Sequence, residues 1–244
     1  MEIVKFTKKK GSWYELLFDN NDKLLVHEDL ILKYELLLSR KIGDNKDRII
    51  DENNYYVAYD KAIKYLSNKT RSKLEIKNYL LKQNIDEQKI EFVIEKLCNQ
   101  GYLNDEIYAR LYVKDRINLS NDGPNKIVSS LKNQNIDETY IDKAMQEYDN
   151  NLQKDRIDRL IRKQIKTNSN KGSNLLKQKI LLNLVNLGYD RHFVIDLLDT
   201  ISIDDTDLYQ KEYAKIKEKL SKKYSGKELE LRIKQKLYQK GFKG

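Results

Sequence analysis

The sequence predicts a mainly α-helical protein, in which tandem three-helix repeats form an elongated, curved solenoid behind a small N-terminal β-meander. The pentapeptide QNIDE occurs at residues 83–87 and again at 134–138, and the apolar residues around both copies match in register. Apolar residues within each unit recur at helical spacing. A hydrophobic content of 39% favours several thin cores over one thick core.

The first 50 residues differ from the rest and form the predicted N-terminal domain. The runs EIVKFT, SWYELLF and KLLVH are rich in β-formers, and KKKG and DNND between them are turn signals, so we expect a three-stranded meander. A short helix over 29–38 and a polar linker, GDNKDR, should follow. We expect Trp13 to pack against this sheet rather than to form a base-stacking platform.

The first predicted repeat covers residues 51–104. Apolar residues from Tyr55 to Leu66 follow the spacing of one buried helical face. A second helix begins near Ser72, whose spacing to Glu75 indicates a capping box, and it directs Leu80 inward. A third helix runs from Asp86 to about residue 100.

Three further repeats are predicted at 105–150, 151–203 and 204–244. In the second, Gly123 and Pro124 open a helix that buries Leu131, since proline at the first helical turn removes no helical hydrogen bond. In the third, Gly172 stands alone and simply precedes a helix. The fourth has two helices, with a second capping box expected from Ser225 to Glu228.

The repeated pentapeptide is interpreted as a helix-to-helix corner rather than a site. Asn84 and Asn135, with Gly188 and Gly241 at the matching positions, fall where a helix ends, and both residue types readily adopt the left-handed conformation. An apolar residue then folds back onto the finished helix. The aspartates that follow, Asp86, Asp137 and Asp190, should cap the next helix.

The sequence offers little catalytic chemistry. Its two histidines, His27 and His192, lack metal-ligand neighbours, and no phosphate-binding glycine loop or nucleophile elbow is present. The single cysteine, Cys98, lies in an apolar helical pattern and is expected to be a buried thiol. We therefore expect a non-enzyme without metal or cofactor. With no apolar signal core and no membrane span, the protein is expected to be cytoplasmic.

Positive charge concentrates in the C-terminal third. Residues 151–244 contain 22 Lys and Arg against 12 Asp and Glu, whereas residues 1–150 are close to neutral. On one predicted helix, several basic residues share a face opposite Ile157, Leu160 and Ile161; they are Arg156, Arg159, Arg162, Lys163 and Lys166. This face could follow a phosphate backbone. An ordinary solvated helix face is the alternative.

The segments GYLNDEIYARLYVKDR (101–116) and GPNKI (123–127), with the pattern from Tyr65 to Leu80, closely resemble the RecX family of recombination regulators. The resemblance is specific over residues 55–150 and looser, but in register, to the end of the chain. We interpret its residues as mainly structural: Tyr102, Leu103, Tyr108 and Ala109 in the core and Asp105 as a helix cap. The full set is Leu80, Asp86, Gly101, Tyr102, Leu103, Asp105, Tyr108, Ala109, Gly123, Pro124, Leu131 and Asp137.

The resemblance implies a monomer that binds the RecA recombinase and the RecA–DNA filament, inhibits the ATPase and strand-exchange activities of RecA, and so limits homologous recombination and DNA repair. Single- and double-stranded DNA are further candidate partners. The candidate filament or nucleic-acid contacts are Arg71, Lys73, Arg116, Lys126, Arg156, Arg159, Arg162, Lys163 and Lys166. A helical-repeat protein that binds DNA without contacting RecA, or a scaffold for another protein, remains the alternative.

Overall fold

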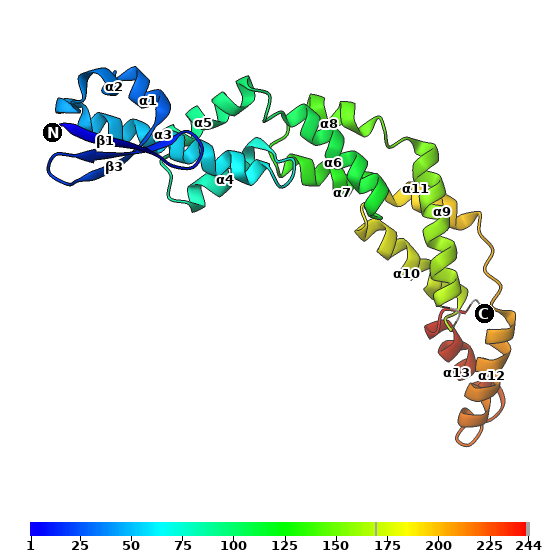
Figure 1. Ribbon diagram of the computed structural model, residues 1–244. Coiled ribbons are helices and arrows are strands. Elements are labelled where there is room, and N and C mark those ends of the chain that lie inside the picture. The colour runs from blue at the N-terminus through cyan, green and yellow to red at the C-terminus, as the bar shows by residue number, and fades with distance from the viewer. Residues whose placement is uncertain (169, 243–244) are drawn as a thin grey trace. The chain divides into compact units, whose positions relative to one another are not determined.

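The computed structural model describes residues 1–168 and 170–242, in two compact units, Met1–Tyr108 and Ala109–Gly244. The predicted class is confirmed, since the chain is mainly helical with one small N-terminal sheet (Figure 1). Lys243 and Gly244, which end the predicted fourth repeat, lie outside the described residues, as does Ser169.

The N-terminal sheet is the expected meander. Strands β1 (Ile3–Lys8), β2 (Trp13–Phe18) and β3 (Lys23–His27) pair antiparallel in sequence order. The helix expected over 29–38 is divided into α1 (Glu28–Lys33) and α2 (Leu36–Ser39), because Glu35 adopts a left-handed conformation with φ 48°. A 3-10 turn, η1 (Gly43–Asn45), follows α2.

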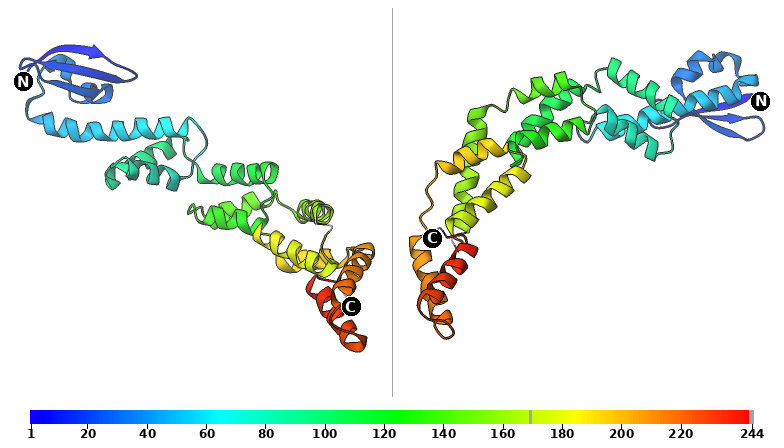
Figure 2. Two further views of the ribbon diagram at one scale, coloured as in Figure 1. Left: turned by 90° about the horizontal axis from the view of Figure 1, so that it is seen from below. Right: turned by 180° about the vertical axis from the view of Figure 1, so that it is seen from behind.

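The expected polar linker is not a linker, because helix α3 (Lys46–Leu66) begins within it. Ile49, in the first turn of α3, is fully buried in the core of the sheet. The helix then continues to the first repeat, where Ala58 and Ala62 are buried against other helices. Figure 2 shows α3 running from the sheet to the three-helix region that follows. One helix thus belongs to two hydrophobic cores.

Polar contacts fix the sheet onto α3. The buried Asn53 side chain accepts a hydrogen bond from the His27 backbone N–H (3.0 Å) and donates one to the Leu25 carbonyl. Trp13 is 9% exposed, and its indole N–H donates to the Asp60 carboxylate at 2.5 Å. Trp13 is therefore a packing residue of the sheet, as expected.

The first repeat is completed by α4 (Lys73–Lys82) and α5 (Glu87–Asn99). Its core contains Ile76, Leu80, Ile90 and Val93, all with no exposed surface. The expected capping box is present: the Ser72 hydroxyl accepts from the Glu75 N–H, and the Glu75 carboxylate accepts from the Ser72 N–H.

Further helices follow in the pattern that the periodicity predicts. They are α6 (Asp105–Leu119), α7 (Pro124–Lys132), α8 (Glu138–Met145), α9 (Asn150–Thr167), α10 (Ser173–Asn186), α11 (Arg191–Asp199), α12 (Thr206–Leu220) and α13 (Gly226–Gln239). The capping box expected before α13 is wrong, because Ser225 makes no side-chain cap and Glu228 instead pairs with Arg232 at 3.0 Å.

The helix corners have the predicted geometry. Asn84, Asn135, Gly188 and Gly241 all have positive φ, between 54° and 92°. The Asp86, Asp137 and Asp190 carboxylates each accept a backbone N–H at the start of the next helix. The repeated pentapeptide is therefore a structural corner.

In the second unit, the glycine corners also join neighbouring repeats. The Gly123 N–H, just before α7, donates to the Leu187 carbonyl at 2.6 Å, and the Asn125 N–H donates to the Gly188 carbonyl at 3.0 Å. Both bonds recur one repeat later. There the Gly172 N–H donates to Lys240 (3.1 Å) and the Asn174 N–H to Gly241 (3.0 Å).

These two junctions, here called the glycine clasps, require glycine. A Cβ atom on Gly123 would stand 2.5 Å from the Gly188 carbonyl carbon, and one on Gly172 would overlap Gly241 in the same way. Gly172 therefore does more than precede a helix. Each clasp supplies carbonyl partners to N–H groups that the start of a helix leaves unsatisfied.

The first glycine clasp predicts that a substitution at Gly123 lowers the stability of the protein. Gly123 has an ordinary φ of −81°, where alanine normally stabilises a protein by about 0.4–1 kcal/mol. We expect Gly123→Ala instead to destabilise the second unit by about 2 kcal/mol or more, because the new methyl group meets backbone atoms that cannot rotate away. Urea unfolding followed by circular dichroism measures the change. A stabilised variant would contradict the clasp.

His27 caps helix α1 in its neutral form. Its Nδ1 accepts the Asp29 N–H at 3.2 Å, and its ring stacks on Tyr56 with centroids 4.0 Å apart. Burial lowers the pKa of His27, although the nearby carboxylates of Asp29, Asp60 and Glu28 act in the opposite direction. Lys96 lowers it further.

The lowered His27 pKa makes the stability of the N-terminal unit depend on pH. The ordinary pKa is 6.5, so the stabilisation is present above pH 6.5 and is lost as the pH falls through the lower folded-state value. We expect the urea midpoint, followed by fluorescence of the single tryptophan Trp13, to fall on acidification below pH 6.5. His27→Gln should reduce this dependence, whereas the same change at the exposed His192 should preserve it. Equal profiles for the two variants would exclude His27 as the titrating group.

Candidate functional site

Four basic residues form an exposed face on α9. Arg159, Arg162, Lys163 and Lys166 are exposed, on the side of the helix opposite the buried Ile157 and Ile161. In the part of the chain that the structure describes, no carboxylate lies within ion-pair distance of these four residues. We call them the α9 basic face. An anionic ligand could reach all four without displacing an internal partner.

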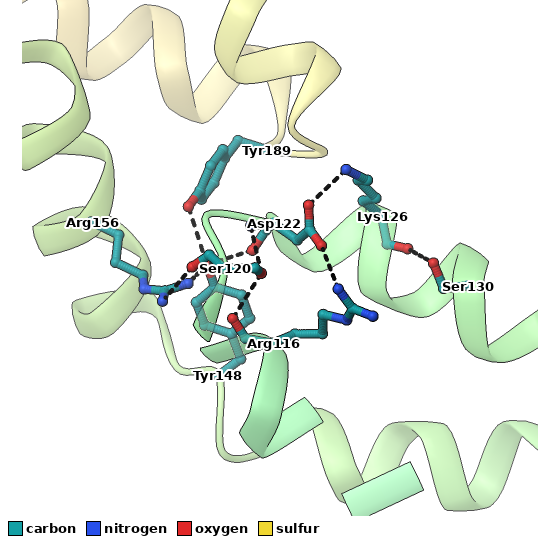
Figure 3. Close-up of polar contacts among 8 residues, drawn as sticks. All are labelled: Arg116, Ser120, Asp122, Lys126, Ser130, Tyr148, Arg156 and Tyr189. Atoms are coloured by element: carbon teal, nitrogen blue, oxygen red, sulfur yellow. Dashed lines mark hydrogen bonds and ion pairs between the residues drawn. The ribbon is translucent and has the colours of Figure 1, made fainter. Parts of the chain in front are cut away.

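Arg156, expected on the same face, is buried instead, with 6% of its surface exposed. Its guanidinium donates to the Ser120 carbonyl at 3.0 Å, to the Ile117 carbonyl and to the Tyr148 hydroxyl at 3.2 Å (Figure 3). The two carbonyls belong to the C-terminal end of α6, where unsatisfied C=O groups and the helix dipole favour a cation. Arg156 therefore caps α6 from the next repeat and is not available to a phosphate.

The same network holds the corner after α8. The Tyr148 hydroxyl donates to the Asp122 carbonyl at 3.2 Å and lies 3.3 Å from the Tyr189 hydroxyl (Figure 3). Burial is the main cause that raises the pKa of Tyr189, and the hydrogen bond with Tyr148 raises it further. The Tyr189 phenol is thus kept neutral within a buried junction between consecutive repeats.

Arg116 and Lys126, also expected as contacts, share one carboxylate. Asp122 lies 2.6 Å from Lys126 Nζ and 3.7 Å from the Arg116 guanidinium, which also lies over the Tyr112 ring at 4.8 Å (Figure 3). Both cations are about half exposed. The structure brings them together, but around an internal anion that offsets part of their charge.

Arg71 and Lys73 take part in the fold of the first repeat. The Arg71 guanidinium lies 4.0 Å from the Tyr65 ring centroid and 3.2 Å from the Glu75 carboxylate. Lys73 donates its backbone N–H to the Asp105 carboxylate at 3.0 Å, and its ammonium lies 3.9 Å from the same group. These two residues are apart from the α9 basic face in the sequence and have internal partners.

Most of the family-like motif is structural. Leu80, Leu103, Tyr108, Ala109 and Leu131 are buried. Gly101 has a φ of 76° where α5 ends, and Pro124 occupies the first turn of α7.

Two residues of the motif differ from their expected roles. Tyr102 is 60% exposed, because Leu103 takes the core position after the left-handed Gly101 and the neighbouring side chain points away. Asp105 does cap a helix, but the helix is α4, whereas Asn104 caps α6 by accepting the Ile107 N–H at 3.0 Å. Tyr102 thus has no place in the core.

The sequence pattern does not predict the aromatic cleft that lies between α3 and α5. It has a volume of about 410 Å³, and Tyr55, Tyr56, Tyr59 and Phe92 line it together with charged residues. The tyrosines recur at helical spacing, which predicts a buried face. They are only partly buried, because a tyrosine can pack its ring while its hydroxyl reaches solvent.

Metal and membrane features are absent from the described residues. No group of three or more His, Cys, Asp or Glu side chains there could hold a metal ion, and no helix there is long and apolar enough to cross a membrane. Burial raises the pKa of the Cys98 thiol, which disfavours the reactive thiolate.

Comparison with known proteins identifies the family. The family models for the first and second three-helix domains of RecX match residues 58–97 and 104–145. The regulatory protein RecX of Bacillus cytotoxicus is 32% identical over 99% of this chain and 92% of its own length. The chain belongs to the RecX family. The RecX of Oceanobacillus iheyensis is 30% identical, over 89% of this chain and 82% of its own length.

Solved RecX structures share the fold. A crystal structure of regulatory protein RecX superposes with a TM-score of 0.71 at 24% identity, covering 82% of this chain and 99% of that one. RecX from Lactobacillus salivarius superposes with a TM-score of 0.55 at 28% identity, covering 62% of this chain and 99% of that one. The two matched RecX domains end before α9, so the basic face lies outside them.

The two roles of basic residues on α9 can be separated by mutation. We expect Arg156→Leu to destabilise the second unit by about 2–5 kcal/mol, because it leaves buried carbonyl and hydroxyl groups without their donor. The matched Arg159→Leu removes an exposed side chain and should change stability by less than about 0.5 kcal/mol. Thermal melts of both variants provide the measurement. Similar melting temperatures would contradict the buried network.

Proposed function

We propose that this RecX-family protein binds the RecA recombinase and its nucleoprotein filament and inhibits the ATPase and strand-exchange activities of RecA. It thereby limits homologous recombination and DNA repair, acting in the cytoplasm as a monomer and without catalysis of its own. The observation that carries the proposal is the near full-length relationship to RecX regulatory proteins, together with the two matched three-helix domains.

A regulator of this kind acts through surfaces that bind, and the α9 basic face is one such surface. Its four cations have no carboxylate partner among the described residues, so their charge is available to an external anion. Each phosphate that they neutralise releases counterions, which makes binding weaken as salt rises. This face supports contact with the DNA of the filament.

The same face supports an alternative, in which the protein binds DNA without contacting RecA. The excess of positive charge in residues 151–244 favours this alternative. The two functions differ in what survives when the face is removed. A DNA-only protein would lose all activity, whereas a protein that also contacts RecA would keep part of it.

Charge reversal distinguishes the two functions. We expect Arg159→Glu, Arg162→Glu and Lys163→Glu together to weaken oligonucleotide binding. The log–log slope of binding against salt should become smaller by about two for single strands. The triple variant should retain part of the inhibition of RecA. Arg156 must be left intact because it is buried. The assay follows single-strand-dependent ATP turnover by RecA and, separately, oligonucleotide anisotropy.

A matched triple reversal at the exposed Lys10, Lys64 and Lys82 controls for net charge. Complete loss of both activities in the α9 variant alone would favour the DNA-only alternative. Failure of the wild-type protein to lower ATP turnover at stoichiometric amounts would exclude the proposed function.

A further inference from the structure

The cleft between α3 and α5 combines aromatic walls with one cation that has no carboxylate partner among the described residues. Tyr55, Tyr56 and Tyr59 come from α3, and Phe92 and Lys96 come from α5. Phe92 is 52% exposed, with its ring at an edge-to-face angle to Tyr55 and 5.1 Å away. Surfaces with exposed aromatic side chains beside a cation are typical of the centres of protein interfaces.

The other cations at the cleft already have carboxylate partners. Glu52 pairs with Lys33 at 2.7 Å and with Arg48 at 3.6 Å. The hydrogen bond from Lys33 is the main cause that holds the pKa of Glu52 below its ordinary value, so this carboxylate remains charged. Asp51 in turn pairs with Lys89 at 2.5 Å.

Lys96 is different. Its ammonium lies over the rings of Tyr56 (5.2 Å) and Tyr59 (4.8 Å), and no carboxylate of the described chain pairs with it. Ring faces hold the ammonium in place but do not neutralise it. The cleft therefore presents a fixed positive charge next to apolar surface.

These features favour a peptide over a nucleic acid. Base stacking needs open ring faces, but His27 and Lys96 cover Tyr56, and Lys89 lies over Tyr55 at 5.6 Å. An acidic peptide segment could instead place one carboxylate on Lys96 and one apolar side chain on Phe92.

We propose that the α3–α5 cleft is a docking site for an acidic segment of a protein partner, with a carboxylate bound by Lys96 and an apolar side chain packed on Phe92. The proposal rests on the proposed function in taking RecA as that partner. It also explains how contact with RecA could persist without the α9 basic face, since the two surfaces share no residue.

The experiment uses the full-length protein and two probes. One probe is the RecA filament, and the other is a fluorescent pentapeptide with phenylalanine between two pairs of glutamates. We expect Lys96→Glu and Phe92→Ala each to weaken binding of both probes about tenfold or more. The matched controls, Lys82→Glu and Leu81→Ala at exposed positions of α4, should stay within about twofold of wild type. Lys96→Met, which keeps the stem and removes the charge, replaces Lys96→Glu if that variant melts early.

The outcomes separate this proposal from the proposed function. Cleft variants that bind RecA filaments as wild type does would overturn the docking site and leave RecA binding intact. If the wild-type protein does not bind the RecA filament, the proposed function is wrong. Peptide binding then tests the docking site. The docking-site proposal holds only if the wild-type protein binds the peptide and Lys96→Glu does not. Cleft variants that instead lose oligonucleotide binding would show a nucleic-acid site and overturn the proposal.

Discussion

The ends of the helices are the constraint on which the rest of this structure depends. A three-helix repeat has a thin core, and each helix leaves backbone N–H groups at its start and C=O groups at its end without internal partners. Neighbouring segments satisfy these groups. The glycine clasps bring corner carbonyls to the starts of α7 and α10, and the Asp205 carboxylate accepts the Ser173 N–H at 2.6 Å. At the other end of a helix, the Arg156 guanidinium donates hydrogen bonds to the carbonyls that end α6.

This arrangement explains why residues of the family-like motif have few free functional groups. Asp105 stabilises the start of α4, and Gly123 allows close contact with the backbone at Gly188. Substitution at these positions changes stability first, and any effect on a partner follows from that. The residues available for recognition are those whose charge has no carboxylate partner among the described residues, such as the α9 basic face and Lys96. Function in this chain is therefore expected to lie between the repeated positions.

Much of the fold could be predicted from the sequence, because helical periodicity and corner residues are local signals. The left-handed Asn and Gly positions and the aspartate caps followed from residue type alone. Other features depended on tertiary contacts. Arg156 lies one residue from the buried Ile157, and only the packing of α6 against it decides that its side chain turns inward.

The differences from the sequence predictions have two physical causes. Tyr102 and the tyrosines of the cleft are amphipathic, so spacing does not show how far their rings are covered. Helix α3 starts earlier than expected because Ile49 packs in the core of the sheet and not in the core of the repeat. Gly172 resembled an isolated glycine because its partner, Gly241, is distant in sequence. For Ile49 and Gly172 the deciding neighbour lies outside the local sequence.

The count of cations overstates how strongly this chain can respond to a phosphate backbone. Of the nine basic residues expected to bind it, Arg71, Lys73, Arg116, Lys126 and Arg156 have internal partners. Among these nine, four then remain to release counterions, and together they contribute a log–log slope of about three on single strands. Electrostatic attraction of that size gives weak, sequence-independent binding that salt readily reverses. A regulator that must distinguish a recombinase filament from bare DNA therefore needs contacts with the protein of the filament as well, and such contacts require apolar surface beside a charge of fixed position.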